Sequence, residues 1–92
     1  MTLVDELVEW LRIPSISAGA RDEAALTQAA EWAADKIRRA GGTAELEPTK
    51  GGAPHVVGEL RSSREDAPTI LIYGHYDVQD PGELSEWTSP PF

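Results

Sequence analysis

The hydrophobic positions of the first eleven residues recur at intervals of three and four. This spacing predicts a helix over residues 2–11 with one apolar face, formed by Leu3, Val4, Leu7, Val8 and Leu11. Thr2 and Asp5 resemble a capping box at its start. Pro14 ends the helix, because the residue before a proline is pushed out of the α region.

A second helical pattern fills the sequence RDEAALTQAAEWAADKIRRAGG, which follows a loop at residues 15–21. Acidic residues near its start and basic residues near its end match the helix macrodipole. The pair Gly41-Gly42 supplies a left-handed stop. Its side chains predicted to face inward are Ala25, Leu26, Ala29, Trp32, Ala33 and Ile37.

After the glycines the period changes to two, which is typical of strands. Residues 43–47 alternate, residues 48–54 are rich in turn formers, and residues 55–61 are apolar again. Residues 69–73 are apolar without interruption from Ile70 to Ile72, which predicts a third strand buried on both faces. Two helices followed by three strands predict an α/β or α+β fold in which helices cover a mixed sheet.

Composition narrows the possible functions. A length of 92 residues allows one small domain. The net charge of -8 repels phosphate backbones and anionic lipid headgroups, so we expect neither nucleic acid nor a membrane as a partner. The absence of cysteine excludes disulfides, thiolate zinc sites and a cysteine nucleophile. No signal sequence or membrane span is recognisable, and a cytoplasmic protein is the expectation.

The candidate chemistry lies where the third predicted strand ends, at Gly74, His75 and Asp77. Functional groups gather beyond the carboxyl ends of buried strands in open α/β sheets, so we expect both side chains to face one shared cavity there. A neutral imidazole binds divalent metals, and a nearby carboxylate can accept the hydrogen bond of its other ring nitrogen. Gly74 allows an unusual dihedral angle or the close approach of another group.

The sequence ILIYGHYDVQD followed by EWTSPPF closely resembles the first metal-site motif of the M20 family of zinc metallopeptidases. Within that family it is most similar to the dipeptidase branch that includes carnosine-type dipeptidases. The resemblance covers roughly the last quarter of the chain, and RIPSIS and HVVGEL match more loosely upstream. Asp80-Pro81-Gly82 departs from the pattern, since relatives more often place proline directly after the glutamine.

The resemblance implies that His75 is a ligand to one of two zinc ions and that Asp77 orients its imidazole. It further implies hydrolysis of dipeptides or short peptides by a water activated between the two metals, with a glutamate as general base. In the family, that glutamate and the remaining ligands follow the Pro-Phe element. We therefore expect residues 1–92 to be the N-terminal portion of a catalytic domain, inactive alone, with apolar surface that a second copy could cover as a homodimer.

Two alternatives stay open. An amino-acid deacylase of the same family would use the same two metals, although GHYDVQ favours the dipeptidase branch. A non-catalytic α/β binding module would use His75 and Asp77 only to cap a strand. Ser15 and Ser17 have no histidine at a helpful spacing, so serine catalysis has no support.

The remaining histidine and the tryptophans have structural interpretations. His55 has no second ligand spaced to join it and is interpreted as a structural or surface residue. Trp10 and Trp32 are interpreted as packing residues on the two helices. Trp87 either packs the loop after the motif against the domain or walls a substrate site, and packing is favoured.

Overall fold

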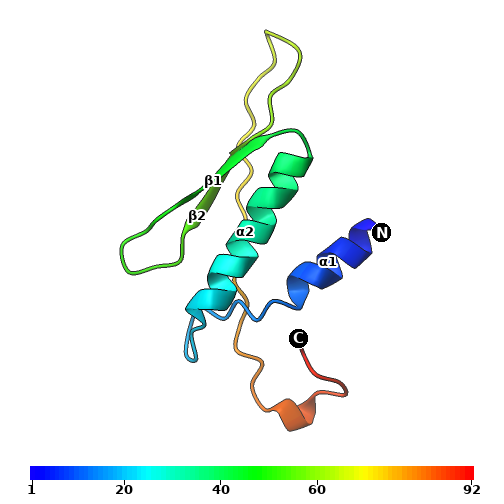
Figure 1. Ribbon diagram of the computed structural model, residues 1–92, viewed down its shortest axis with the longest axis vertical. Helices are drawn as coiled ribbons and strands as arrows, with labels where there is room; N and C mark the ends of the chain where they lie inside the picture. The colour runs from blue at the N-terminus through cyan, green and yellow to red at the C-terminus, as the bar shows by residue number, and fades with distance from the viewer.

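The computed structural model describes residues 1–92 and contains helices, one small sheet and a short 3₁₀ helix (Figure 1). In chain order these are α1 (Leu3–Leu11), α2 (Glu23–Arg39), β1 (Thr43–Glu47), β2 (His55–Glu59) and η1 (Leu84–Glu86). Helix α2 packs on the sheet, and α1 lies against α2. The α/β fold class predicted from the sequence is confirmed.

The start of α1 and the end of α2 agree with the sequence prediction. The Thr2 hydroxyl accepts the Asp5 backbone N–H at 3.2 Å, and the Asp5 carboxylate accepts the Thr2 N–H at 2.7 Å. Asp22 caps α2 by accepting the backbone N–H of Ala25 at 3.0 Å. Gly41 follows α2 with a φ of 95°, a conformation that glycine adopts without steric cost. No helix has the length and apolar character needed to cross a bilayer.

Strands β1 and β2 form an antiparallel hairpin in which Thr43 pairs with Glu59 and Glu47 pairs with His55. Alternate residues of β1 turn inward, so that Ala44 is buried while its neighbours are exposed. The two strands predicted at residues 43–47 and 55–61 are therefore present, although β2 ends slightly earlier than predicted.

The core is small and is centred on the inner face of α2. Only 8 of 92 residues are buried, and α1 contributes none of them. The buried residues are Ile13, Ser15, Ala25, Leu26, Ala29, Ala30, Ala34 and Ala44. Three residues predicted to face inward, Trp32, Ala33 and Ile37, are half-buried instead. Trp32 stacks on Trp10 of α1 and Ile37 lies against Gly58 of β2, so both side chains point inward without being fully covered.

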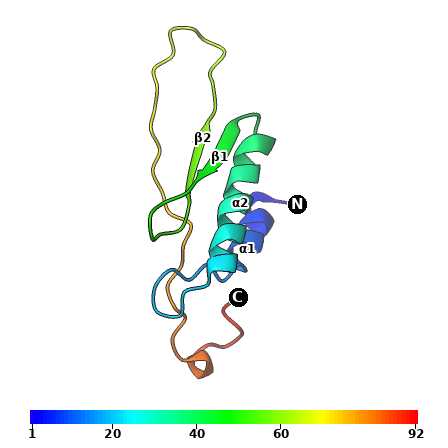
Figure 2. The same ribbon diagram turned by 60° about the vertical axis from the view of Figure 1, so that its left-hand side comes forward.

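The predicted third strand is wrong for this structure. Residues 69–73 are not a strand, and the side chains from Ile70 to Tyr73 are 79 to 92% exposed. None of their backbone groups has a hydrogen-bond partner within the chain. A buried strand needs a neighbour on each edge, and the hairpin supplies neither of them. Figure 2 shows this part of the chain, in yellow, as a long loop standing away from the helices.

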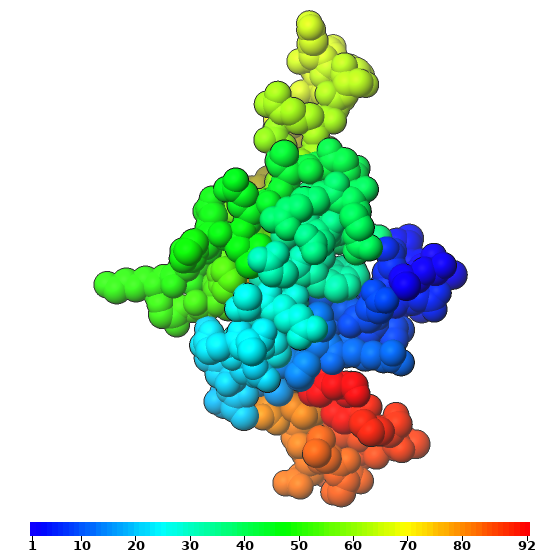
Figure 3. All heavy atoms as spheres, in the orientation of Figure 1, coloured from blue at the N-terminus to red at the C-terminus, as the bar shows by residue number.

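The predicted mixed sheet is also wrong, because the sheet has two antiparallel strands only. Parallel pairing is limited to one isolated bridge between Ile16 and Val78. The molecule is correspondingly open, with a radius of gyration of 15.6 Å where a compact chain of this length has about 12 Å. In Figure 3 the yellow loop and the orange-to-red C-terminal segment project from opposite ends of the helical body.

Candidate functional site

The candidate site is a segment formed by residues 75–78, held against the loop that joins α1 to α2. The Ser15 hydroxyl donates a hydrogen bond to the carbonyl of Tyr76 at 2.9 Å, and the Val78 N–H donates to the carbonyl of Ser15 at 3.0 Å. The Ser17 hydroxyl donates to Oδ2 of Asp77 at 2.5 Å. Segments about sixty residues apart in sequence are thereby fixed side by side.

Tyr76 anchors this segment to the core. Its ring packs against the cluster formed by Ile13, Ala25 and Ala29, and its hydroxyl donates to the carbonyl of Pro54 at 2.7 Å. Burial raises the pKa of the Tyr76 phenol, with the nearby Asp77 carboxylate contributing in the same direction. The neutral phenol is therefore the form that holds the segment in place.

The side chains of His75 and Asp77 face each other. Nδ1 of His75 lies 2.8 Å from Oδ1 of Asp77 and 3.1 Å from its backbone carbonyl. Both partners are oxygen acceptors at neutral pH, so Nδ1 carries the proton and donates it. This arrangement leaves the lone pair of Nε2 free on a side chain that is 77% exposed.

Asp77 is the better-fixed member of this pair. One carboxylate oxygen faces Ser17 and the other faces His75. The Ser17 hydrogen bond, followed by that of His75, lowers the pKa of the Asp77 carboxyl. Asp77 therefore carries a negative charge that stabilises a proton on the facing ring nitrogen.

The surroundings of the pair differ from the expectation in two respects. Gly74 has no positive φ, and a Cβ placed on it would meet nothing within 4 Å, so neither proposed reason for this glycine applies here. The pair also does not follow a strand end, because residues 69–73 form no strand in this structure.

The donor set of the segment fits one position of a metal site. His75 has the chemistry of a metal ligand, with a free Nε2 and a carboxylate on its other nitrogen. No three histidine, aspartate or glutamate residues come close enough to hold an ion together. A catalytic zinc takes about three protein ligands. The chain therefore offers one candidate ligand with a carboxylate beside it, and no group of three candidate ligands.

The other candidates lie elsewhere in the fold. His55 is exposed at the start of β2, opposite Glu47. Trp87 donates its indole N–H to the carbonyl of Pro81 at 2.9 Å and is 49% exposed, so it braces the C-terminal segment itself and does not pack it against the rest of the domain. In the Asp80-Pro81-Gly82 turn, the Asp80 carboxylate accepts the Gly82 N–H at 2.9 Å, and Gly82 has a φ of 71°.

Sequence reasoning missed the two residues that hold the site, Ser15 and Ser17. Neither serine has a histidine at the spacing of a nucleophile, and no local spacing connects the two with residues 75–78. One weak signal could have found them. Two hydroxyl side chains alternate in the stretch after Pro14, and the polar motif at the other end of the chain needs hydrogen-bond partners.

No family model matches the chain, and no solved structure matches it significantly. Curated proteins do match it, among them the cysteinylglycine-S-conjugate dipeptidase of Corynebacterium striatum. That protein is 36% identical over 64 residues, which make up 70% of this chain and 14% of the relative. The chain thus spans a small fraction of the length of the relative it matches. Over that fraction it is similar to a dipeptidase.

Proposed function

We propose that this chain contributes one histidine ligand to the zinc site of a hydrolase that cleaves dipeptides or short peptides. The observation that carries the proposal is the geometry of His75 and Asp77, in which Nδ1 faces a carboxylate oxygen at 2.8 Å and Nε2 stays free. The similarity to a cysteinylglycine-S-conjugate dipeptidase supports the substrate class. The M20-like motif at residues 70–80 supports zinc and a two-metal site.

In this proposal each residue has a defined task. His75 binds the metal through Nε2, while the Asp77 carboxylate holds the proton on Nδ1 and keeps the ring from turning. Tyr76 fixes the backbone between them through its packed ring and its bond to Pro54. Bound zinc would polarise the scissile carbonyl and lower the pKa of a bound water.

The proposal treats residues 1–92 as the N-terminal portion of the catalytic domain, with the remaining ligands and the general base supplied by further chain. The lack of a three-residue metal cluster supports this assignment. The exposed apolar side chains at residues 70–73 support it too, because such a stretch is usually covered in a finished domain. Residues 1–92 alone should hydrolyse no dipeptide.

The test uses the natural-length protein that contains this chain, loaded with zinc. We expect it to hydrolyse cysteinylglycine S-conjugates or other dipeptides faster than N-acyl amino acids, and the reverse preference would favour a deacylase. His75→Ala should remove most activity and lower the zinc content, whereas the matched variant His55→Ala should change neither. Wild-type turnover and zinc content in His75→Ala would refute the proposal.

A further inference from the structure

Ser17 lies on the far side of Asp77 from His75. Its hydroxyl donates to Oδ2 of Asp77 at 2.5 Å, while Oδ1 of the same carboxylate faces the histidine. The two oxygens of Asp77 therefore have separate partners from segments about sixty residues apart. Three side chains form a continuous hydrogen-bonded row.

Having a partner on each oxygen matters for the orientation of Asp77. A carboxylate turns easily about its last side-chain torsion, because that torsion has broad and shallow minima. A single hydrogen bond to one oxygen leaves the plane of the group poorly fixed. A second bond, to the other oxygen, restricts the rotation of Asp77 and hence the direction in which it offers Oδ1 to His75.

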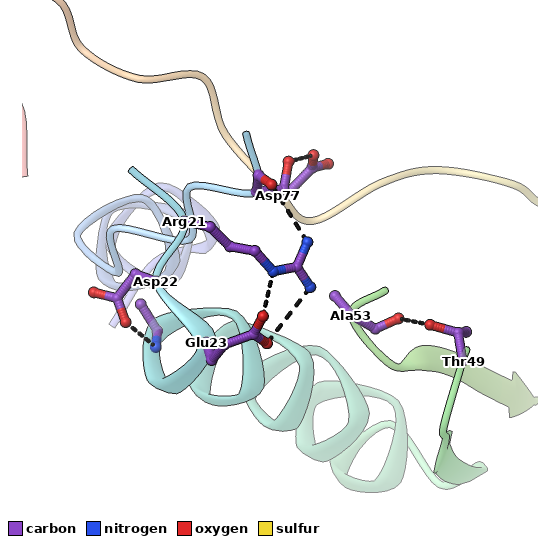
Figure 4. A network of polar contacts seen from close by, with 8 residues as sticks. Arg21, Asp22, Glu23, Thr49, Ala53 and Asp77 are labelled. Atoms are coloured by element: carbon purple, nitrogen blue, oxygen red, sulfur yellow. Dashed lines mark hydrogen bonds and ion pairs between the residues drawn. The ribbon is translucent and has the colours of Figure 1, made fainter. Parts of the chain in front are cut away.

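Ser17 is itself held in place. The bridge between Ile16 and Val78 and the backbone bond from Val78 to Ser15 align its segment with the site. On the other side, Arg21 donates to the Ser17 carbonyl at 3.3 Å and pairs with Glu23 at the start of α2. Figure 4 shows Arg21 between Glu23 and the loop beside Asp77. The Ser17 hydroxyl therefore lies on a loop that is held on both sides by hydrogen bonds.

We propose that Ser17 is a positioning residue of the metal site: its hydroxyl orients Asp77, which keeps the proton on Nδ1 of His75 and so leaves Nε2 available as a ligand. The metal-binding part of this inference rests on the proposed function. The alignment of the three side chains does not depend on any metal.

The first test is made on the metal-free 92-residue chain by ¹⁵N NMR of the histidine rings, at a pH where both imidazoles are neutral. Ring nitrogen shifts give the fraction of each tautomer. The matched pair is Ser17→Thr and Ser17→Val, which have nearly the same shape and differ in the hydroxyl. We expect Ser17→Thr to keep the Nδ1–H tautomer of His75 and Ser17→Val to lower its ratio to the other tautomer by about three- to tenfold.

Two controls separate positioning from general loosening of the loop. Ser15→Ala removes a hydroxyl that braces the same loop without touching Asp77, and it should shift the tautomer less than Ser17→Val does. His55, at the start of β2, should keep its tautomer in every variant. Equal tautomer ratios in Ser17→Thr and Ser17→Val, or an equal shift in Ser15→Ala, would overturn the proposal.

The second test measures zinc affinity of the natural-length protein. A partner that directly orients a ligand typically contributes about 10- to 100-fold to metal affinity. Ser17 acts through Asp77, so Ser17→Val should weaken zinc binding by up to about tenfold and Ser17→Thr should restore it. If Ser17→Val changes the tautomer but the wild-type protein binds no zinc, the proposed function is rejected and the role of Ser17 in orienting Asp77 is kept. Zinc bound through His75 equally well in both variants would reject the role of Ser17 and keep the function.

Discussion

Trp10 of α1 and Trp32 of α2 stack with their ring centroids 5.1 Å apart and their planes inclined by 11°. The indole N–H of Trp10 also donates to the carbonyl of Ala29 at 3.1 Å. Because α1 has no buried residue, this pair is the main apolar attachment of the first helix. The apolar face of α1, from Leu3 to Leu11, remains largely exposed.

Trp10→Ala should therefore detach α1 from α2. We expect a loss of about 1 to 3 kcal/mol in the free energy of unfolding, since the pair adds aromatic stacking to the area that it buries. Near-ultraviolet circular dichroism should lose the signal of the coupled indoles. Trp87→Ala is the matched control, because Trp87 lies in the C-terminal segment and is 49% exposed. An unchanged dichroism spectrum in Trp10→Ala would contradict the stacking.

The ion pair between Glu6 and Lys36, 2.5 Å apart, should make the docking of α1 depend on pH. The hydrogen bond from Lys36 lowers the pKa of the Glu6 carboxyl below its ordinary 4.5. A lowered pKa means that the contribution to stability is present above about pH 4.5 and is lost as the pH falls through the folded-state pKa. Carboxyl ¹³C NMR titration of Glu6 in wild type and Lys36→Gln measures this effect. A titration midpoint that does not rise in Lys36→Gln would contradict the pairing.

Gly58 of β2 lies against the Ile37 side chain of α2. A Cβ at this position would lie 2.7 Å from Cδ1 of Ile37 and 3.1 Å from the carbonyl oxygen of Thr43, so the end of the Ile37 side chain would have to move. Gly58→Ala should therefore cost about 1 kcal/mol of stability by overpacking. Urea denaturation would measure the loss, with Gly74→Ala as the control because open space surrounds that glycine. Equal stability in the two variants would show that the helix and the strand are farther apart.

Ile72 tests the open conformation of residues 69–73. Its side chain is 88% exposed, so Ile72→Lys should change the free energy of unfolding of this chain by less than about 0.5 kcal/mol. A buried strand would lose several times more, because an unpaired charge would enter the core. Thermal unfolding of the two proteins distinguishes these cases. Leu26→Lys, at a position that is 0% exposed, is the destabilising comparison.

Local signals in the sequence predicted the parts of the fold that depend on near neighbours. The cap at Thr2 and the stop at Gly41 depend on residues a few positions away, and the sequence predicts both correctly. The two strands follow from the change to a period of two, whereas the cap at Asp22 was not predicted. The strand prediction for residues 69–73 was wrong, because an apolar run indicates only a tendency toward burial. A strand also needs partner strands, and none pairs with these residues.

In the candidate site, too, contacts between near neighbours could be predicted and contacts between distant segments could not. His75 and Asp77 were identified from two positions of one motif, and their hydrogen bond needs only local geometry. Ser17 could not be predicted, because its contact with Asp77 depends on the folded path of the sixty residues between them. The metal-ligand role of His75 stays a prediction.

The most direct test of the central claim is cadmium-113 NMR of the natural-length protein, with cadmium in place of zinc and the histidine rings labelled with ¹⁵N. We predict a one-bond coupling between the metal and Nε2 of His75, a proton retained on Nδ1, and no coupling to His55. Stoichiometric metal without any coupling to His75, or coupling through Nδ1 instead, would contradict the account.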